Sequence, residues 1–224
     1  MGDRRHWVLT QKTFTKWANV QLNGAYTIND VEKDLDEGLM VVVLFEALRK
    51  QKVNIKYNKN PRMRVARLEN RNQALKFITA DGVKLVIIDA QNIVDGDLKL
   101  VLGLLWTLIL KYQISQNKAD ASKNALLEWV DSKVVQHKVK NLSSDRNDGT
   151  TVCELISKLE PEFIDMNKAN GKPAGDQRIE YAENTAEKTN IPSIIDPMDM
   201  SMDDPDELSV MAYICTTATT RRRS

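Results

Sequence analysis

The stretch Asp95–Ile114, DGDLKLVLGLLWTLILKYQI, predicts a helix that is apolar on nearly every side. Within residues 98–110 the apolar run is interrupted only by Lys99, Gly103 and Thr107. The run falls short of the roughly 20 apolar residues that a membrane-spanning helix needs. Such a helix must be covered on more than one side, so we expect one face to anchor its own domain and the other to meet a second surface.

The composition is that of an ordinary globular protein, with 42% hydrophobic and 28% charged residues among 224. The opening MGDRRHWVLTQ lacks the apolar region of a signal peptide, and we expect no membrane span. Cys153 and Cys215 lie in apolar helical contexts, which favours reduced, buried thiols in the cytosol.

The net charge of +1 hides an asymmetry between the two halves of the chain. Residues 1–117 hold 18 Lys and Arg and 12 Asp and Glu, a net charge of +6. Residues 118–224 hold 14 and 19, a net charge of −5. The halves should attract each other, and the first should favour an acidic partner.

Apolar spacing and capping residues predict an all-α fold. The helices expected in the first half are Thr10–Leu22 with Thr10 as its N-cap, Leu35–Lys50, Met63–Ala80, and the long apolar helix capped by Asp95 or Asp97. The core-facing residues of the third helix are expected to be Val65, Leu68, Ala74, Leu75 and Ile78. After a polar linker at 115–120, helices are expected at Ala121–Val135, Thr151–Leu159, Asp176–Thr189 and Asp206–Thr216.

The second half repeats the first in register. Trp17 and Trp129 lie 112 residues apart, and Gly38 and Gly149, each after an acidic residue and before an apolar helix, lie 111 apart. We therefore predict an internal duplication: two compact bundles of about four main helices each, at 5–114 and 121–218, with a tail at 219–224.

At this point the residues resemble a known family. The first half is similar to the type-1 calponin-homology domain through Thr13–Asn19 (TFTKWAN), Ile93–Gly96 (IVDG), Lys99, Leu102-Gly103 and Trp106-Thr107. The second half resembles the type-2 domain through Ala125–Trp129, Asp148-Gly149, Pro161, Ala186–Lys188, Ile191-Pro192, Asp199-Met200, Pro205–Glu207 and Ser209–Met211. The tandem order is similar to the actin-binding domain of filamins and α-actinins.

This resemblance implies contacts with filamentous actin on the opening helix, on the last helix of the first domain and on the first helix of the second. The corresponding residues are Thr13, Lys16, Leu98, Lys99, Leu102, Leu105, Trp106, Ile109, Lys123 and Glu128. Phe14, Trp17 and Trp129 are expected to serve the cores rather than the filament. The resemblance also implies a closed and an open arrangement of the two domains, for which we expect an interdomain latch formed by Trp106, Leu208 and Met211.

A basic segment lies between residues 49 and 76, where Glu69 is the one acidic residue. Its candidate contact residues are Lys56, Lys59, Arg62, Arg64, Arg67 and Arg71. They form a solvated face, a contact with acidic actin, or a phosphoinositide site. Nucleic acid is disfavoured, because few aromatic residues accompany the basic ones for base stacking.

No catalytic or metal-binding pattern is found in the sequence. The two histidines, His6 and His137, stand alone, and there is no phosphate-binding glycine loop, His/Cys metal spacing, nucleophile elbow or EF-hand loop. We expect a non-enzymatic module without cofactors that binds filamentous actin in the cytoplasm and the actin cytoskeleton. We expect it to be the monomeric head of a longer crosslinker, filamin-like rather than α-actinin-like, which dimerises through other regions. The alternative is a calponin-homology module that binds tubulin, a signalling protein or a phosphoinositide membrane.

Overall fold

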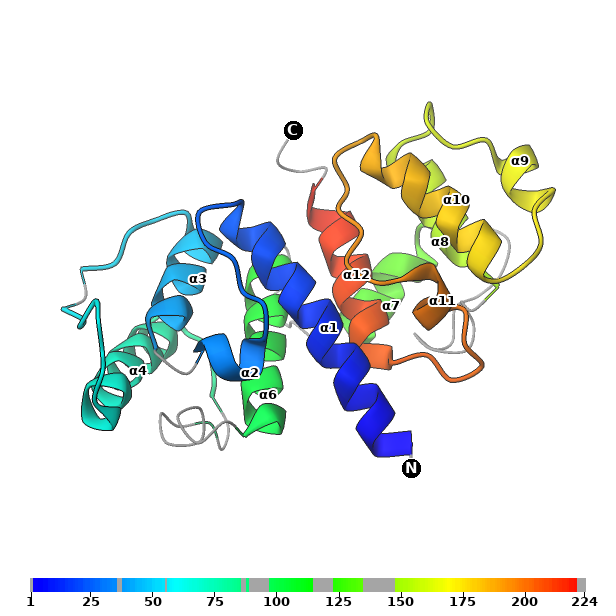
Figure 1. Ribbon diagram of the computed structural model, residues 1–224. Coiled ribbons are helices and arrows are strands. Elements are labelled where there is room, and N and C mark those ends of the chain that lie inside the picture. The colour runs from blue at the N-terminus through cyan, green and yellow to red at the C-terminus, as the bar shows by residue number, and fades with distance from the viewer. Residues whose placement is uncertain are drawn as a thin grey trace. The chain divides into compact units, whose positions relative to one another are not determined.

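The structure is a computed structural model that describes residues 2–35, 38–54, 56–85, 88, 97–114, 123–134 and 148–220. Every regular element in these residues is a helix, as the sequence predicts (Figure 1). The chain divides into two compact units, one formed by Phe14–Tyr112 and the other by Met1–Thr13 together with Gln113–Ser224. The first turns of helix α1, Gly2–Leu22, therefore belong to the unit that contains Gln113–Ser224, and its last turns belong to the unit Phe14–Tyr112.

The unit Phe14–Tyr112 is built around the apolar helix predicted from the sequence. That helix is α6 (Leu98–Ile109), which a π-helical turn extends through Ile114. The other helices of the unit are α2 (Val31–Asp34), α3 (Leu39–Arg49) and α4 (Arg64–Ala80). The Asp97 carboxylate caps α6 by accepting a hydrogen bond from the Leu100 N–H, as predicted. Half of the twelve residues of α6 are buried, namely Val101, Leu102, Leu104, Leu105, Leu108 and Ile109.

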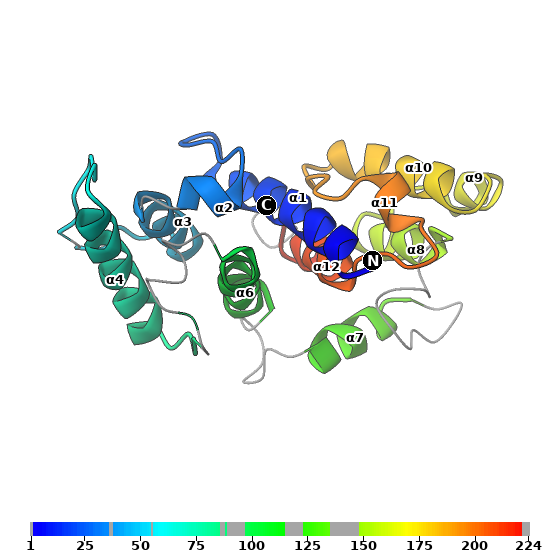
Figure 2. The same cartoon turned by 60° about the horizontal axis from the view of Figure 1, so that its bottom comes forward.

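The other unit contains α7 (Lys123–Asp131), α8 (Thr150–Leu159), α9 (Met166–Asn170), α10 (Asp176–Glu187), α11 (Pro197–Met200) and α12 (Glu207–Thr220). Helix α10 packs against α8, α9 and α11, and the two views agree on this arrangement (Figures 1 and 2). Its apolar residues Ile179, Ala182 and Ala186 are buried. Helix α10 thus has the place in this unit that α4, which packs on α3, has in the other.

Two glycines mark the repeat in three dimensions. Gly38 and Gly149 begin α3 and α8 with left-handed backbone angles, φ of 71° and 80°. A Cβ on Gly38 would lie 2.8 Å from Arg71 Cγ on α4, and a Cβ on Gly149 would lie 2.9 Å from Ile179 Cγ1 on α10. The same close approach therefore occurs in both units, which confirms the internal duplication.

Several predicted helix limits are wrong, three of them as follows. Helix α1 begins at Gly2, so Thr10 is not an N-cap but a residue in mid-helix whose hydroxyl donates to the His6 carbonyl at 2.9 Å. The helix predicted at 35–50 corresponds to α3, which begins at Leu39 because Gly38 interrupts the helical backbone after α2. Helix α12 continues past Thr216 to Thr220, where buried threonine hydroxyls donate to carbonyls one turn earlier.

One predicted core residue of α4 is also wrong. Val65 is 70% exposed. It lies six residues before Arg71, so it points away from the buried stripe that continues through Ala74, Leu75 and Ile78. The cysteines agree with the prediction: Cys153 and Cys215 are free and buried, and burial raises the pKa of the Cys153 thiol to about 12. In the described part of the chain, no helix combines the length and apolar character needed to cross a bilayer.

Candidate functional site

The predicted contact residues on α6 differ in their access to solvent. Leu102, Leu105 and Ile109 are at most 1% exposed. Lys99 is exposed, and Leu98 and Trp106 are half-buried. The outer surface of α6 therefore combines one cation with partly accessible apolar side chains.

Trp106 is held in place by a ring contact with the first helix. Its indole stacks on the Phe14 ring, with the centroids 6.4 Å apart and the planes inclined by 10°. Phe14 and Trp17 have no exposed surface, so the prediction that they serve the core is confirmed. Stacking of this kind fixes the orientation of the indole through an aromatic contact worth about 1 kcal/mol beyond its buried area.

The other predicted contact residues lie on α1 and α7. Thr13 is buried at 3% exposure, and Lys16 is half-buried. Glu128 on α7 is exposed, whereas the side chain of Lys123 lies outside the described part of the chain. On α12, Leu208 is half-buried and Met211 is 1% exposed.

The basic segment contains one residue that does not belong to a surface. Arg71 is completely buried, and its Nε and Nη2 donate to the Leu35 carbonyl at 3.2 and 2.8 Å. The prediction of Arg71 as a contact residue is therefore wrong, because its guanidinium holds the end of α2 next to Gly38. The sequence carried the signal: Arg71 precedes Ala74, Leu75 and Ile78 at helical spacing.

The remaining basic residues lie at the surface of the same unit. Lys56, Lys59, Arg62 and Arg64 are exposed, and Arg67 is half-buried. Asn70 holds the loop that carries Lys56 and Lys59, because its side-chain amide accepts from Asn58 N at 2.7 Å and donates to Asn58 O at 2.9 Å. These cations therefore extend from a loop that is fixed to α4.

Beside this loop lies an open hollow of about 650 Å³. Lys52, Lys56 and Lys59 line it together with Glu46 and Glu69. The Glu46 carboxylate accepts hydrogen bonds from Lys52 Nζ at 2.6 Å and from Val53 N at 3.0 Å. The hydrogen bond between Lys52 and Glu46 raises the pKa of Lys52. The hollow is thus mixed in charge, and Lys56 and Lys59 carry its basic character.

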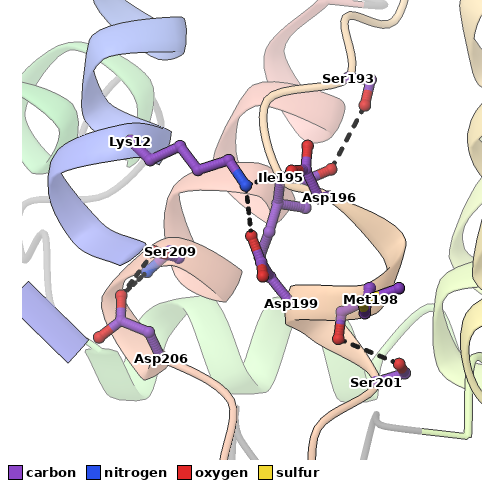
Figure 3. Close-up of polar contacts among 9 residues, drawn as sticks. All are labelled: Lys12, Ser193, Ile195, Asp196, Met198, Asp199, Ser201, Asp206 and Ser209. Carbon is purple, nitrogen blue, oxygen red and sulfur yellow. Dashed lines mark hydrogen bonds and ion pairs between the residues drawn. The ribbon is translucent and has the colours of Figure 1, made fainter. Parts of the chain in front are cut away.

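Sequence reasoning missed a polar contact between the start of α1 and residues 196–206 (Figure 3). Lys12 Nζ hydrogen-bonds to the carboxylates of Asp196 and Asp199, the latter at 2.8 Å. These two hydrogen bonds, that to Asp196 first, raise the pKa of Lys12 above 10.5. The Thr10 hydroxyl lies 2.8 Å from Asp206 Oδ2 and is buried with it.

Two further contacts belong to the same group. Arg5 Nη2 donates to the Asp204 carbonyl at 2.9 Å, and His6 Nε2 lies 3.1 Å from Asp204 Oδ2. The sequence signal is the concentration of carboxylates between residues 196 and 207, of which the sequence analysis used only Asp206 as the start of a helix. Among the described residues, no group of three or more His, Cys, Asp or Glu side chains is placed to hold a metal ion.

Comparison with known proteins defines the class of this all-helical tandem repeat. The calponin homology (CH) domain family matches residues 9–114 and again residues 120–223. Alpha-actinin-like protein 1 of Schizosaccharomyces pombe is 37% identical over 213 residues, which cover 91% of this chain and 34% of that protein. Filamin-A of Drosophila melanogaster is 35% identical over 220 residues, covering 92% of this chain and 10% of that protein.

A solved structure has the same fold. The actin-crosslinking core of Schizosaccharomyces pombe fimbrin superposes with a TM-score of 0.78 at 23% identity, covering 95% of this chain and 48% of that one. The chain belongs to the calponin homology family and carries two CH domains in tandem. It spans only 34% and 10% of the length of the two curated relatives described above.

Proposed function

We propose that this chain is a module that binds filamentous actin and serves as the head of an actin-crosslinking protein. The observation that carries the proposal is the pair of CH domains in tandem, shared along almost the whole chain with an alpha-actinin-like protein and a filamin. A location on the actin cytoskeleton follows from this function.

The proposed filament contact is centred on the accessible side of α6. Lys99 offers a cation to an acidic filament, while Leu98 and Trp106 offer partly exposed apolar surface next to it. Lys16 on α1 and Glu128 on α7 extend the contact. Leu102, Leu105 and Ile109 are buried, so they contact the filament only if the residues that cover them move away.

The proposed regulation is a competition for α6. In the closed state the second domain would cover Trp106 through Leu208 and Met211, and the filament would bind the state in which this latch is released. The apparent affinity is then reduced by the fraction of molecules that are closed. Substitutions that weaken the latch raise that affinity without adding a contact.

A second candidate function is supported by the exposed segment at the start of α4. Met63 is 71% and Val65 is 70% exposed, and both stand among the exposed Arg62 and Arg64. Apolar side chains flanked by cations suit an anionic membrane surface, including one that contains phosphoinositides. Sedimentation with anionic and with neutral vesicles tests this candidate, since only the anionic vesicles should carry the protein down.

The filament contact is tested by reversing the charge of Lys99. Lys99 lies in the first turn of α6, where a carboxylate suits the helix dipole, so Lys99→Glu should leave the fold intact. We expect its affinity for actin filaments to fall on the order of tenfold in co-sedimentation, because a cation facing an acidic surface becomes an anion. The matched control is Lys84→Glu, another exposed lysine of the same unit that lies outside the proposed contact.

Equal binding by wild type and Lys99→Glu would exclude α6 as the contact. An equal loss in Lys84→Glu and Lys99→Glu would show that net charge, and not this site, determines binding.

A further inference from the structure

The loop that joins α1 to α2 carries the dipeptide Asn23-Gly24 (Figure 1). Residues 23–27 are all exposed, whereas Leu22 before them and Ile28 after them are 3% and 1% exposed. The Asn19 side chain fixes the far end of the loop, since it accepts from Ile28 N and donates to Ile28 O, both at 2.7 Å. A chemical change at residues 23 and 24 can therefore occur while the unit stays folded.

An asparagine that precedes a glycine can react with the next peptide bond. The glycine backbone nitrogen loses its proton and attacks the side-chain amide carbon of the asparagine, and ammonia leaves, so that a five-membered succinimide ring forms. Water then opens the ring at either carbonyl, which gives aspartate or isoaspartate. One water is consumed and one ammonia is released, with no oxidation or reduction. Glycine favours the attack because it has no Cβ to obstruct the approach.

The surroundings of Asn23 and Gly24 leave the attacking nitrogen available. Asn23 N donates to Asn19 O at 3.1 Å and Ala25 N donates to Leu22 O at 3.0 Å. Between these two donors, the Gly24 N–H has no hydrogen-bond partner among the described residues. A Cβ at Gly24 would have no neighbouring atom within 4 Å, so the succinimide ring has room to form. The nucleophile is therefore not held in a hydrogen bond, and both reacting groups are accessible to water.

Two other exposed asparagines separate the effect of the dipeptide from that of its surroundings. Asn170 also precedes a glycine, but the Gly171 N–H donates to a backbone carbonyl of α9 at 3.0 Å. Asn190 has a left-handed backbone like that of Asn23, with φ of 61° against 48°, but it precedes Ile191, whose N–H donates to a backbone carbonyl of α10 at 3.0 Å. A nitrogen held in a hydrogen bond must first be released by local opening, so the reaction should be slow at both of these sites.

We propose that Asn23 is a site of spontaneous deamidation, in which the Gly24 nitrogen closes the succinimide ring and water yields aspartate and isoaspartate. The reaction needs neither actin nor an enzyme, so it goes beyond the proposed function. Each event places a carboxylate at the C-terminal end of α1, where the helix dipole disfavours an anion, and lowers the formal net charge from +1 to zero. Isoaspartate also adds one methylene to the main chain before Ala25 and Tyr26, which line a hollow of about 250 Å³ beside α3.

The site is tested by ageing the unmodified chain in mildly alkaline buffer made with water enriched in heavy oxygen, which labels every deamidation that occurs before digestion. Mass spectrometry of the peptides then measures the rate and the isoaspartate fraction at each asparagine. We expect Asn23 to react about tenfold faster or more than Asn170 and Asn190, with both aspartate and isoaspartate as products. In denaturant, Asn170 should react within about twofold of Asn23, because the hydrogen bond of Gly171 is lost.

The role of the glycine is tested by Gly24→Ala, in which deamidation of Asn23 should slow on the order of tenfold because a methyl group obstructs the attack. The matched control is Gly171→Ala at the other dipeptide, which should leave the rate at Asn23 unchanged. An Asn23 that reacts no faster than Asn170 in the folded chain would overturn the proposal, and this comparison depends on no variant. Aspartate formed without isoaspartate, or a rate that Gly24→Ala does not change, would also overturn it.

Discussion

Glycine is required at position 38 for two separate reasons. Its φ of 71° lies in the left-handed region, which costs other residues about 1 kcal/mol. A Cβ there would also lie 2.9 Å from Asn70 Cβ and 3.0 Å from the Arg71 backbone nitrogen, and neither atom can move away easily. The sequence predicted a helix start near this residue but not the close approach of α4, since that depends on a partner 32 positions further along the chain.

We predict that Gly38→Ala destabilises the fold by about 2–4 kcal/mol, the sum of backbone strain and overpacking. The matched control is Gly24→Ala in the same unit, where φ is 77° but no atom lies within 4 Å of the added Cβ. Thermal unfolding followed by circular dichroism should show a Tm about 10 °C lower for Gly38→Ala and a much smaller change for Gly24→Ala. Equal shifts in the two variants would show that the packing of α3 on α4 is not as tight as described.

At the scale of elements, apolar spacing predicted the helices well but their ends less well. The cap of α6 at Asp97 and the buried stripe of α4 through Ala74 and Ile78 follow from local rules. The start of α1 at Gly2 does not, because polar contacts from Arg5 and Lys12 to residues near 200 hold these first turns. Local periodicity cannot show a helix end that a distant segment stabilises.

The latch proposal is tested on α12. Leu208→Ala removes most of a half-buried apolar side chain from the surface proposed to cover α6 in the closed state. We predict that its affinity for actin filaments rises several-fold, since the open state becomes more populated. Co-sedimentation at several protein concentrations measures this. Unchanged or weaker binding would contradict competition between latch and filament.

At the scale of the whole molecule, the duplication and the family were readable from the sequence because they rest on repeated motifs. The tandem CH domains and the all-helical fold were predicted and are confirmed. The charge difference between the halves predicted attraction, but not that Lys12 would meet Asp196 and Asp199. Net charge indicates that two surfaces attract; only the fold determines which residues meet.

Co-sedimentation of the unmodified chain with actin filaments at low and at moderate salt tests the central claim most directly. We predict saturable binding that weakens as salt increases, because Lys99 and the exposed basic residues contribute charge to the contact. Absence of pelleting at both salt concentrations, for the unmodified chain and for Leu208→Ala alike, would contradict the assignment of this chain as an actin-binding module.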